Sequence, residues 1–320
     1  MPGVRRTLAV DLGGLVLATP VIVASGCSGS ARETAGLVDP KKVGAVVTRT
    51  ITVEPRKGAP TPRIVETPSA IVWETGLQNP GLDVFVAEEL PRLTRGGPPL
   101  IVSIGGRTLE DYVRLTSALQ GRPEVVALEV HLSEPDQELG RDVLGAYPDR
   151  VSEIVGACAR MSLVPVFAKL PWAPPHLVEI AAAAVRAGAH GLVLVDAPRA
   201  LAVDGPRLKP ALGASTGRLA GPAVKPLTLS AVLDVATALP EVPLIGVGGV
   251  RSGEDAVEML LAGAWAVQVG TATLVDPAAP VLVAQGIARY IKAKNVASPA
   301  DLRGRLRVPA AGTPAPEVPA

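Results

Sequence analysis

The sequence predicts a (β/α)8 TIM barrel, in which eight parallel strands alternate with helices. Three observations point to this fold: short apolar runs bounded by turn residues, Ala/Leu-rich amphipathic stretches between them, and a length of 320 residues, which suits one large barrel. The expected strands are residues 21–25, 45–49, 100–104, 127–132, 164–169, 191–196, 244–247 and 266–270. Helical patterns cover residues 109–119, 150–161, 177–187, 230–239 and 254–262, the last with Ser252 as its N-cap.

The alternative, an open doubly wound sheet, is disfavoured because the loop after the first strand, residues 25–30, lacks the glycine spacing of a dinucleotide-binding turn. Two Gly/Pro-rich stretches interrupt the alternation. Residues 51–81 form a long lid insertion after the second strand, and residues 197–228 form a basic insertion after the sixth. We therefore expect one barrel over residues 1–308 and a disordered Pro/Ala-rich tail over residues 309–320.

The composition excludes several classes of protein. Lys and Arg number 31 against 30 Asp and Glu, which argues against nucleic-acid binding. Two cysteines and three isolated histidines offer neither a disulfide framework nor metal-ligand spacing, so we expect no metal. The chain also contains only two asparagines, Asn79 and Asn295.

The N-terminal segment ends in a run that superficially resembles a lipoprotein cleavage box, residues 21–27. Asp11 interrupts its apolar part, and Gly13, Gly14 and Pro20 break any helix there. No uncharged run free of Gly and Pro breakers is long enough to span a bilayer. These features favour a cytoplasmic protein that is not bound to a membrane.

A phosphate site is expected at the ends of the last two strands. Gly246-Val247-Gly248-Gly249 ends the seventh strand, and Val269-Gly270-Thr271 ends the eighth. The loops after these strands are the usual phosphate site of this fold, and glycines let backbone N–H groups approach an anion. The alternative interpretation is a pair of tight turns. Lys169, at the end of the fifth strand, suits an anionic ligand or an electron-rich ring, or it is a solvated rim charge.

Several motifs resemble the dihydroorotate dehydrogenase family, specifically the class 1B type that works with a separate iron–sulfur/FAD subunit. The resemblance spans about residues 8 to 290 and is carried by these segments: Ala24-Ser25-Gly26, Thr48-Arg49-Thr50, Glu54-Pro55-Arg56, Thr61-Pro62-Arg63, Gly76-Leu77-Gln78-Asn79-Pro80-Gly81, Lys169-Leu170, Gly221-Pro222-Ala223-Val224-Lys225-Pro226 and the two glycine turns. The Gln-Asn-Pro form of the lid motif indicates class 1B rather than 1A.

The resemblance implies an FMN-dependent oxidoreductase that converts dihydroorotate to orotate in pyrimidine biosynthesis. It implies phosphate binding at Gly248, Gly249, Gly270 and Thr271, and further cofactor contacts at Ser25, Arg49, Thr50, Ser103, His131, Lys169, Val195 and Gly221. The residues expected around the substrate are Arg49, Trp73, Gly76, Leu77, His131, Asp196 and Ala197. It also implies a homodimeric core flanked by partner subunits.

The substrate positions depart from the family pattern. The family ends its fourth strand in Asn-x-Ser-Cys-Pro-Asn, with the cysteine as general base, whereas this chain has His131-Leu132-Ser133-Glu134-Pro135-Asp136. The family's Leu-Asn in the lid is Val72-Trp73, and the Asn-Thr after the sixth strand is Asp196-Ala197. The second-strand Lys is Arg49, the third-strand Asn is Ser103, and the family's Gly-Gly-Leu-Ser-Gly turn contains Arg218. The missing asparagines thus fall where the family holds orotate.

These departures leave the chemistry open at two residues. Glu134 is the candidate base, if burial raises its pKa toward the working pH; otherwise it is a solvated loop acid. His131 either donates to flavin or substrate or packs as a strand residue. Asp136, Asp196 and Glu134 would repel an anionic substrate unless Arg49 or Arg218 compensates. The alternatives to dihydroorotate oxidation are a paralogue with another small cyclic or enoyl substrate and a catalytically inactive flavin-binding barrel.

Overall fold

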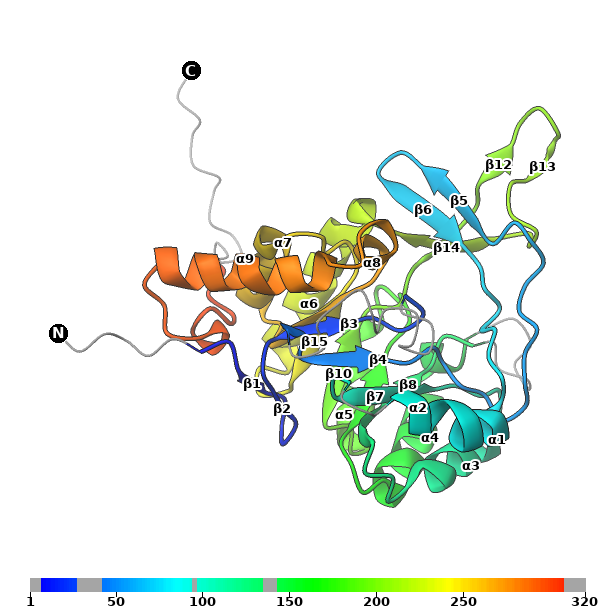
Figure 1. The fold of residues 1–320 in the computed structure, drawn as a ribbon, viewed down its shortest axis with the longest axis horizontal. Coiled ribbons are helices and arrows are strands. Elements are labelled where there is room, and N and C mark those ends of the chain that lie inside the picture. The colour runs from blue at the N-terminus through cyan, green and yellow to red at the C-terminus, as the bar shows by residue number, and fades with distance from the viewer. Residues whose placement is uncertain (1–6, 28–41, 94–96, 135–142, 308–320) are drawn as a thin grey trace.

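The computed structural model describes residues 7–27, 42–93, 97–134 and 143–307, and it confirms the predicted barrel (Figure 1). Eight parallel strands close in the order β10-β15-β16-β3-β4-β7-β8-β9. Their bounds are β3 Val21–Val23, β4 Ala45–Val47, β7 Leu100–Ile104, β8 Val125–His131, β9 Val166–Lys169, β10 Gly191–Leu194, β15 Leu244–Val247 and β16 Ala266–Val269. All eight lie within or overlap the predicted runs, because fully buried parallel strands read as continuous apolar segments.

Helices cover the outside of the barrel. They are α3 Leu109–Leu119, α4 Pro148–Met161, α5 Leu177–Arg186, α6 Lys225–Ala238, α7 Gly253–Ala262, α8 Thr271–Val275 and α9 Ala279–Ala293. The N-cap predicted at Ser252 is present and forms part of a capping box: its side chain accepts from the backbone N–H of Asp255, and the Asp255 carboxylate accepts from the backbone N–H of Ser252. Helix α6 begins at Lys225 rather than at residue 230, so the expected insertion of residues 197–228 is too long. Pro226 lies in the first turn of that helix, where a missing N–H costs nothing.

The first chain segment closes the bottom of the barrel. Strands β1 (Val10–Asp11) and β2 (Val16–Leu17) form an antiparallel hairpin. Leu12 and Leu17 of this hairpin are buried against Phe167, Ile245 and other residues of the barrel interior. The run that resembles a cleavage box, residues 21–27, begins with barrel strand β3, whose three residues are all buried.

The two insertions pair with each other above the opposite end of the barrel. Strands β5 (Ile64–Thr67) and β6 (Ala70–Trp73) come from the lid, and β11 (Arg199–Ala200) and β14 (Gly217–Ala220) come from the second insertion. They form one antiparallel sheet in the order β11-β14-β6-β5, with Trp73 opposite Arg218. A second hairpin, β12 (Val203–Asp204) with β13 (Lys209–Pro210), extends away from the barrel (Figure 1).

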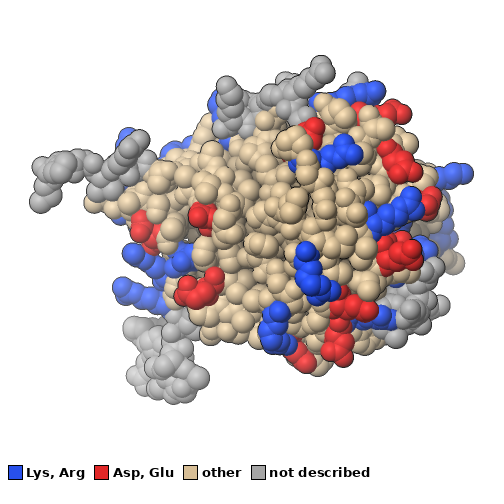
Figure 2. Space-filling view, turned by 90° about the horizontal axis from the view of Figure 1, so that it is seen from below, with Lys and Arg blue, Asp and Glu red and all other residues tan. Residues whose placement is uncertain are grey.

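The segment between the lid and β7 is helical. It comprises α1 (Leu82–Val84), a π-helical turn (Phe85–Glu89) and α2 (Leu90–Leu93), with Phe85 and Leu90 buried. The face shown in Figure 2 carries acidic and basic side chains interspersed with neutral ones. Within the described residues no helix is long and apolar enough to cross a bilayer. The expected tail lies outside the described residues.

Candidate active site

A cavity of about 560 Å³ lies at the C-terminal ends of the barrel strands, bordered by the insertion sheet. This is the end at which barrel enzymes carry their sites, and the volume suits a cofactor-sized ligand. Fifteen of the predicted site residues line it: Ser25, Arg49, Thr50, Trp73, Leu77, His131, Lys169, Val195, Asp196, Ala197, Gly221, Gly248, Gly249, Gly270 and Thr271. The structure thus gathers residues from seven of the eight strand ends and from both insertions.

Three predicted site residues do not line the cavity. Ser103 is fully buried behind Thr50, with the two hydroxyl oxygens 3.0 Å apart. Gly76 lies in the lid, where its N–H donates to Glu74 at 2.7 Å. Glu134 lies in the loop after β8, next to the cavity-lining His131. Asp136 lies outside the described residues.

The ends of β15 and β16 form a cradle of bare backbone in the cavity wall. Gly248 and Gly249 have φ of +131° and +78°, which side chains of L-residues rarely adopt. A Cβ on Gly248 would lie 2.4 Å from Thr228 Oγ1, and one on Gly249 would lie 2.6 Å from Lys225 Cβ. Only glycine therefore fits these two positions. The residues present fit a phosphorylated ligand, because Gly270 and Thr271, which follow the neighbouring parallel strand β16, line the same cavity.

A chain of alternating charges runs from the barrel interior to the insertion sheet. Lys169 Nζ lies 3.8 Å from Glu129 Oε1 and 3.8 Å from Asp196 Oδ1. Asp196 Oδ2 in turn lies 3.6 Å from Arg218 Nη1. Glu129, 1% exposed, accepts a 2.7 Å hydrogen bond from Gln268 on β16. Buried charges of this kind are tolerated because each has an opposite partner.

The same contacts set the protonation states in the cavity wall. Burial alone would lower the pKa of Lys169, but the carboxylates of Glu129 and Asp196 outweigh it and raise that pKa above its ordinary value. Burial would raise the pKa of Asp196, yet Arg218 and Lys169 hold it well below its usual range. Both groups are therefore charged at neutral pH. Of the two arginines named as possible compensating charges, Arg49 and Arg218, it is Arg218 that lies beside Asp196.

Arg218 also fastens the insertion sheet to the barrel. Its Nη2 donates to the carbonyl oxygen of Ser133 at 2.8 Å, and its Nη1 donates to that of Ala197 at 3.2 Å. These carbonyls follow strands β8 and β10. One side chain thus joins the ends of two barrel strands to β14.

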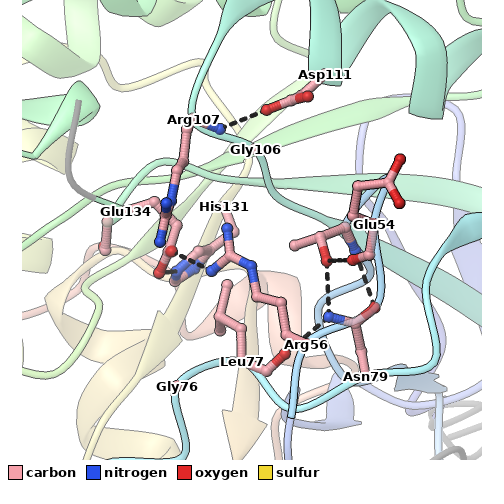
Figure 3. Close-up of polar contacts among 12 residues, drawn as sticks. Glu54, Arg56, Gly76, Leu77, Asn79, Gly106, Arg107, Asp111, His131 and Glu134 are labelled. Carbon is pink, nitrogen blue, oxygen red and sulfur yellow. Dashed lines mark hydrogen bonds and ion pairs between the residues drawn. The ribbon is translucent and has the colours of Figure 1, made fainter. Parts of the chain in front are cut away.

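Glu134 forms an ion pair with the lid. Its Oε2 lies 2.5 Å from Arg56 Nη1, and its Oε1 lies 4.0 Å from His131 Nε2 (Figure 3). Arg56 is held by a two-way backbone bridge to Asn79, at 3.0 and 3.2 Å. The carboxylate is therefore engaged by an arginine that the lid fixes in place.

Three residues of this region, Arg56, Glu129 and Gln268, had no predicted site role, and Cys27 was interpreted as a structural residue. Arg56 belongs to the lid motif Glu54-Pro55-Arg56, so its positive charge in the lid could have indicated a residue of the site. Glu129 and Gln268 are polar residues inside strands that are otherwise apolar, which is itself a signal of a buried polar pair. Cys27 lines the cavity, and burial raises the pKa of its thiol to about 11, so it is a neutral thiol at neutral pH.

A closed (β/α)8 barrel with a glycine cradle and a buried lysine in one cavity is typical of barrel enzymes that act on or with a phosphorylated ligand. The dihydroorotate dehydrogenase family model matches residues 7–291. The chain therefore belongs to the dihydroorotate dehydrogenase family, whose members are oxidoreductases acting on CH–CH bonds.

Curated relatives identify the branch of the family. The chain is 44% identical over 302 residues to "Dihydroorotate dehydrogenase B (NAD(+)), catalytic subunit" of Pelobacter propionicus, covering 94% of this chain and 99% of the relative. It is 42% identical over 296 residues to the protein of the same name from Desulforudis audaxviator, covering 92% and 96%. These relatives confirm the class 1B resemblance. The crystal structure of the Eimeria tenella dihydroorotate dehydrogenase in complex with ferulenol matches with a TM-score of 0.78 at 23% identity, covering 93% of this chain and 88% of that one, and so supports the fold.

Proposed function

We propose that this chain is an FMN-binding catalytic subunit that oxidises dihydroorotate to orotate. The observation that carries the proposal is that one cavity joins the glycine cradle of β15 and β16 to the charged Lys169 of β9. The curated relatives named as type B catalytic subunits support it over 94% of the chain. When bound, FMN supplies a hydride acceptor.

The chain's own residues would hold such a cofactor in two places. Gly248, Gly249, Gly270 and Thr271 would hold its phosphate, and Lys169 would lie against its ring system. Trp73 and Leu77, which the lid brings to the cavity, would exclude water from the reacting face. The proton acceptor belongs to the segment from His131 to Glu134 at the end of β8, which replaces the family's cysteine segment.

A second candidate function is oxidation of a different small cyclic or enoyl substrate. It is favoured by Asp196, an ionised carboxylate in the cavity wall where the family holds orotate with an amide. Lys169 and Arg218 compensate the charge of Asp196, so the difference from the amide lies in hydrogen bonding: a carboxylate only accepts, and it suits a ligand that donates hydrogen bonds.

The experiment begins with the absorbance spectrum of the purified protein. We expect flavin bands, and their absence would contradict the cofactor. Anaerobic addition of dihydroorotate should then bleach those bands within seconds. Retained flavin that dihydroorotate does not bleach would favour the second candidate, or a flavin-binding barrel without catalytic activity.

We further propose a separate iron–sulfur/FAD subunit as the electron acceptor, because the relatives carry the name "catalytic subunit" with NAD(+). The chain itself would form a homodimeric core in the cytoplasm. Co-expression with a neighbouring gene for such a subunit, followed by size-exclusion chromatography with light scattering, tests both points. A monomer that gains no NAD(+)-linked turnover from the partner would contradict them.

A further inference from the structure

The end of strand β8 presents two groups able to accept a proton, and they differ in what they contact. His131 lines the cavity, with 8% of its side chain exposed. Glu134 does not line it, and its carboxylate is bound to Arg56 at 2.5 Å. To act directly on a ligand, Glu134 would have to leave Arg56. His131 is already at the cavity wall.

Charges from four surrounding elements act on His131. Burial lowers the pKa of its imidazole. Asp196 after β10 and Glu134 of its own loop raise that pKa, while Lys169 on β9 and Arg218 on β14 lower it, and the net direction is down. The imidazole is therefore neutral at neutral pH, which is the form that accepts a proton.

A proton taken by His131 would find a partner already in place. Nε2 of the ring lies 4.0 Å from Oε1 of Glu134, whose other oxygen is held by Arg56 (Figure 3). An imidazolium at this position is paired with a carboxylate whose direction is fixed. The separation is an ion-pair distance rather than a hydrogen bond, and the arrangement resembles that of a histidine base beside an oriented acid.

We propose that His131 is the catalytic proton acceptor and that Glu134, fixed by Arg56, is a positioning residue that stabilises its protonated form. The proposal rests on the proposed function. One substrate C–H bond breaks and its proton passes to the His131 imidazole. The neighbouring C–H bond would give up hydride, with its electron pair, to bound FMN, which would supply the two-electron oxidation. A carbon–carbon double bond would form in the substrate, and His131 would later release its proton to water.

The first test requires neither flavin nor substrate. The chain has three histidines, so nitrogen-15 histidine NMR resolves each ring, and His131→Gln assigns one of them. We expect the His131 ring to be neutral at pH 7 and to titrate below the ordinary value of about 6.5. Glu134→Gln should move the titration of His131 to lower pH by roughly one pH unit, which corresponds to a tenfold higher proton concentration.

His176→Gln is the matched control for this titration, because the His176 side chain is 67% exposed and lies at the start of α5. It should leave the His131 signal unchanged. A His131 ring that is protonated at pH 7, or one whose titration Glu134→Gln does not move, would overturn the proposal.

The second test measures anaerobic flavin reduction by dihydroorotate in a stopped-flow instrument across pH. His131→Gln should slow reduction by about 10²-fold or more, with bound flavin retained. Glu134→Gln should slow it by a smaller factor and move the acidic limb of the pH profile to lower pH. Arg56→Gln should resemble Glu134→Gln, and the double variant should add little to either.

The reverse ranking would assign the base to Glu134: abolished reduction in Glu134→Gln with an ordinary rate in His131→Gln overturns the proposal. A wild-type flavin that dihydroorotate leaves oxidised contradicts the proposed function instead. The NMR titration then still decides the protonation state and the coupling of His131 and Glu134.

Discussion

Asp196 shows at the scale of one residue how the cavity balances its charges. It lies 3.8 Å from Lys169 and 3.6 Å from Arg218, and only 6% of it is exposed. Asp196 therefore lies between Lys169, the cation of the barrel interior, and Arg218, the cation of the insertion sheet. Removing its charge therefore affects both neighbours at once, since a buried charge without its partner is strongly destabilising.

We predict that Asp196→Asn lowers the free energy of unfolding by about 3 kcal/mol at neutral pH. Because the folded-state pKa of Asp196 is depressed, its contribution is present above about pH 4 and is lost as pH falls through the folded pKa. The loss caused by Asp196→Asn should therefore shrink in acid. Urea unfolding at pH 7 and at about pH 3 measures both values. Asp204→Asn, at a surface ion pair in which Arg207 is exposed and Asp204 is partly exposed, is the control and should cost less than about 1 kcal/mol. Equal losses at the two pH values would contradict the assignment.

From the sequence, Lys169, Asp196 and Arg218 could be placed near the cavity, but which of them form ion pairs with one another could not be determined. Lys169, Asp196 and Arg218 were each recognised from a strand end or a motif. Their contacts depend on the angle between the insertion sheet and the barrel, which no local pattern encodes. Glu129 was missed because its strand reads as buried and apolar. A single acidic residue in such a run also does not indicate which residue of β16 it contacts.

At the scale of elements, the barrel strands were predictable and the insertion sheet was not. A strand buried on both faces gives a short apolar run, as Leu100–Ile104 does. Strand β6 instead pairs with β14, about 145 residues later in the chain, and such long-range antiparallel pairing leaves no local periodicity. Helix α9 was also not predicted, although its buried positions follow a helical spacing.

The glycine turn after β15 gives the prediction at this scale. Gly249→Ala places a Cβ 2.6 Å from the Lys225 side chain and forces φ of +78° on alanine. We expect a loss of about 1–3 kcal/mol in unfolding free energy and at least a tenfold loss in FMN affinity. Thermal melts and flavin fluorescence titration measure the two effects.

Gly14→Ala is the control for this variant. Its φ of +104° is also unusual, but a Cβ there meets nothing within 4 Å, and it lies in the hairpin at the other end of the barrel. It should cost stability without weakening FMN binding. If both variants bind FMN as the wild type does, the cradle does not hold the phosphate.

At the scale of the whole molecule, the two ends of the barrel carry separate tasks. The end covered by the β1–β2 hairpin is an apolar cluster that contains Leu12, Leu17 and Phe167. The other end carries the cavity, the charged chain and both insertions. In TIM barrels the C-terminal end of the strands carries the active site, and the N-terminal end contributes mainly to stability. Substitutions in the β1–β2 hairpin should therefore lower stability and leave ligand binding unchanged.

Leu12→Ala tests this division, because Leu12 is fully buried beneath the barrel strands. Removing its side-chain carbons leaves a cavity in close-packed surroundings, and we expect a loss of about 2–4 kcal/mol in unfolding free energy. Flavin affinity and the rate of flavin reduction at 25 °C should stay within about twofold of wild type, since the folded state remains dominant at that cost. Val16→Ala, at a position 68% exposed in the same hairpin, should change stability by less than about 0.5 kcal/mol. Urea unfolding followed by flavin titration of both variants provides the comparison. If Leu12→Ala lowers flavin affinity together with stability, the hairpin-covered end of the barrel and the cavity at the other end are energetically coupled. The inferred separation of stability and ligand binding between the two ends would then be wrong.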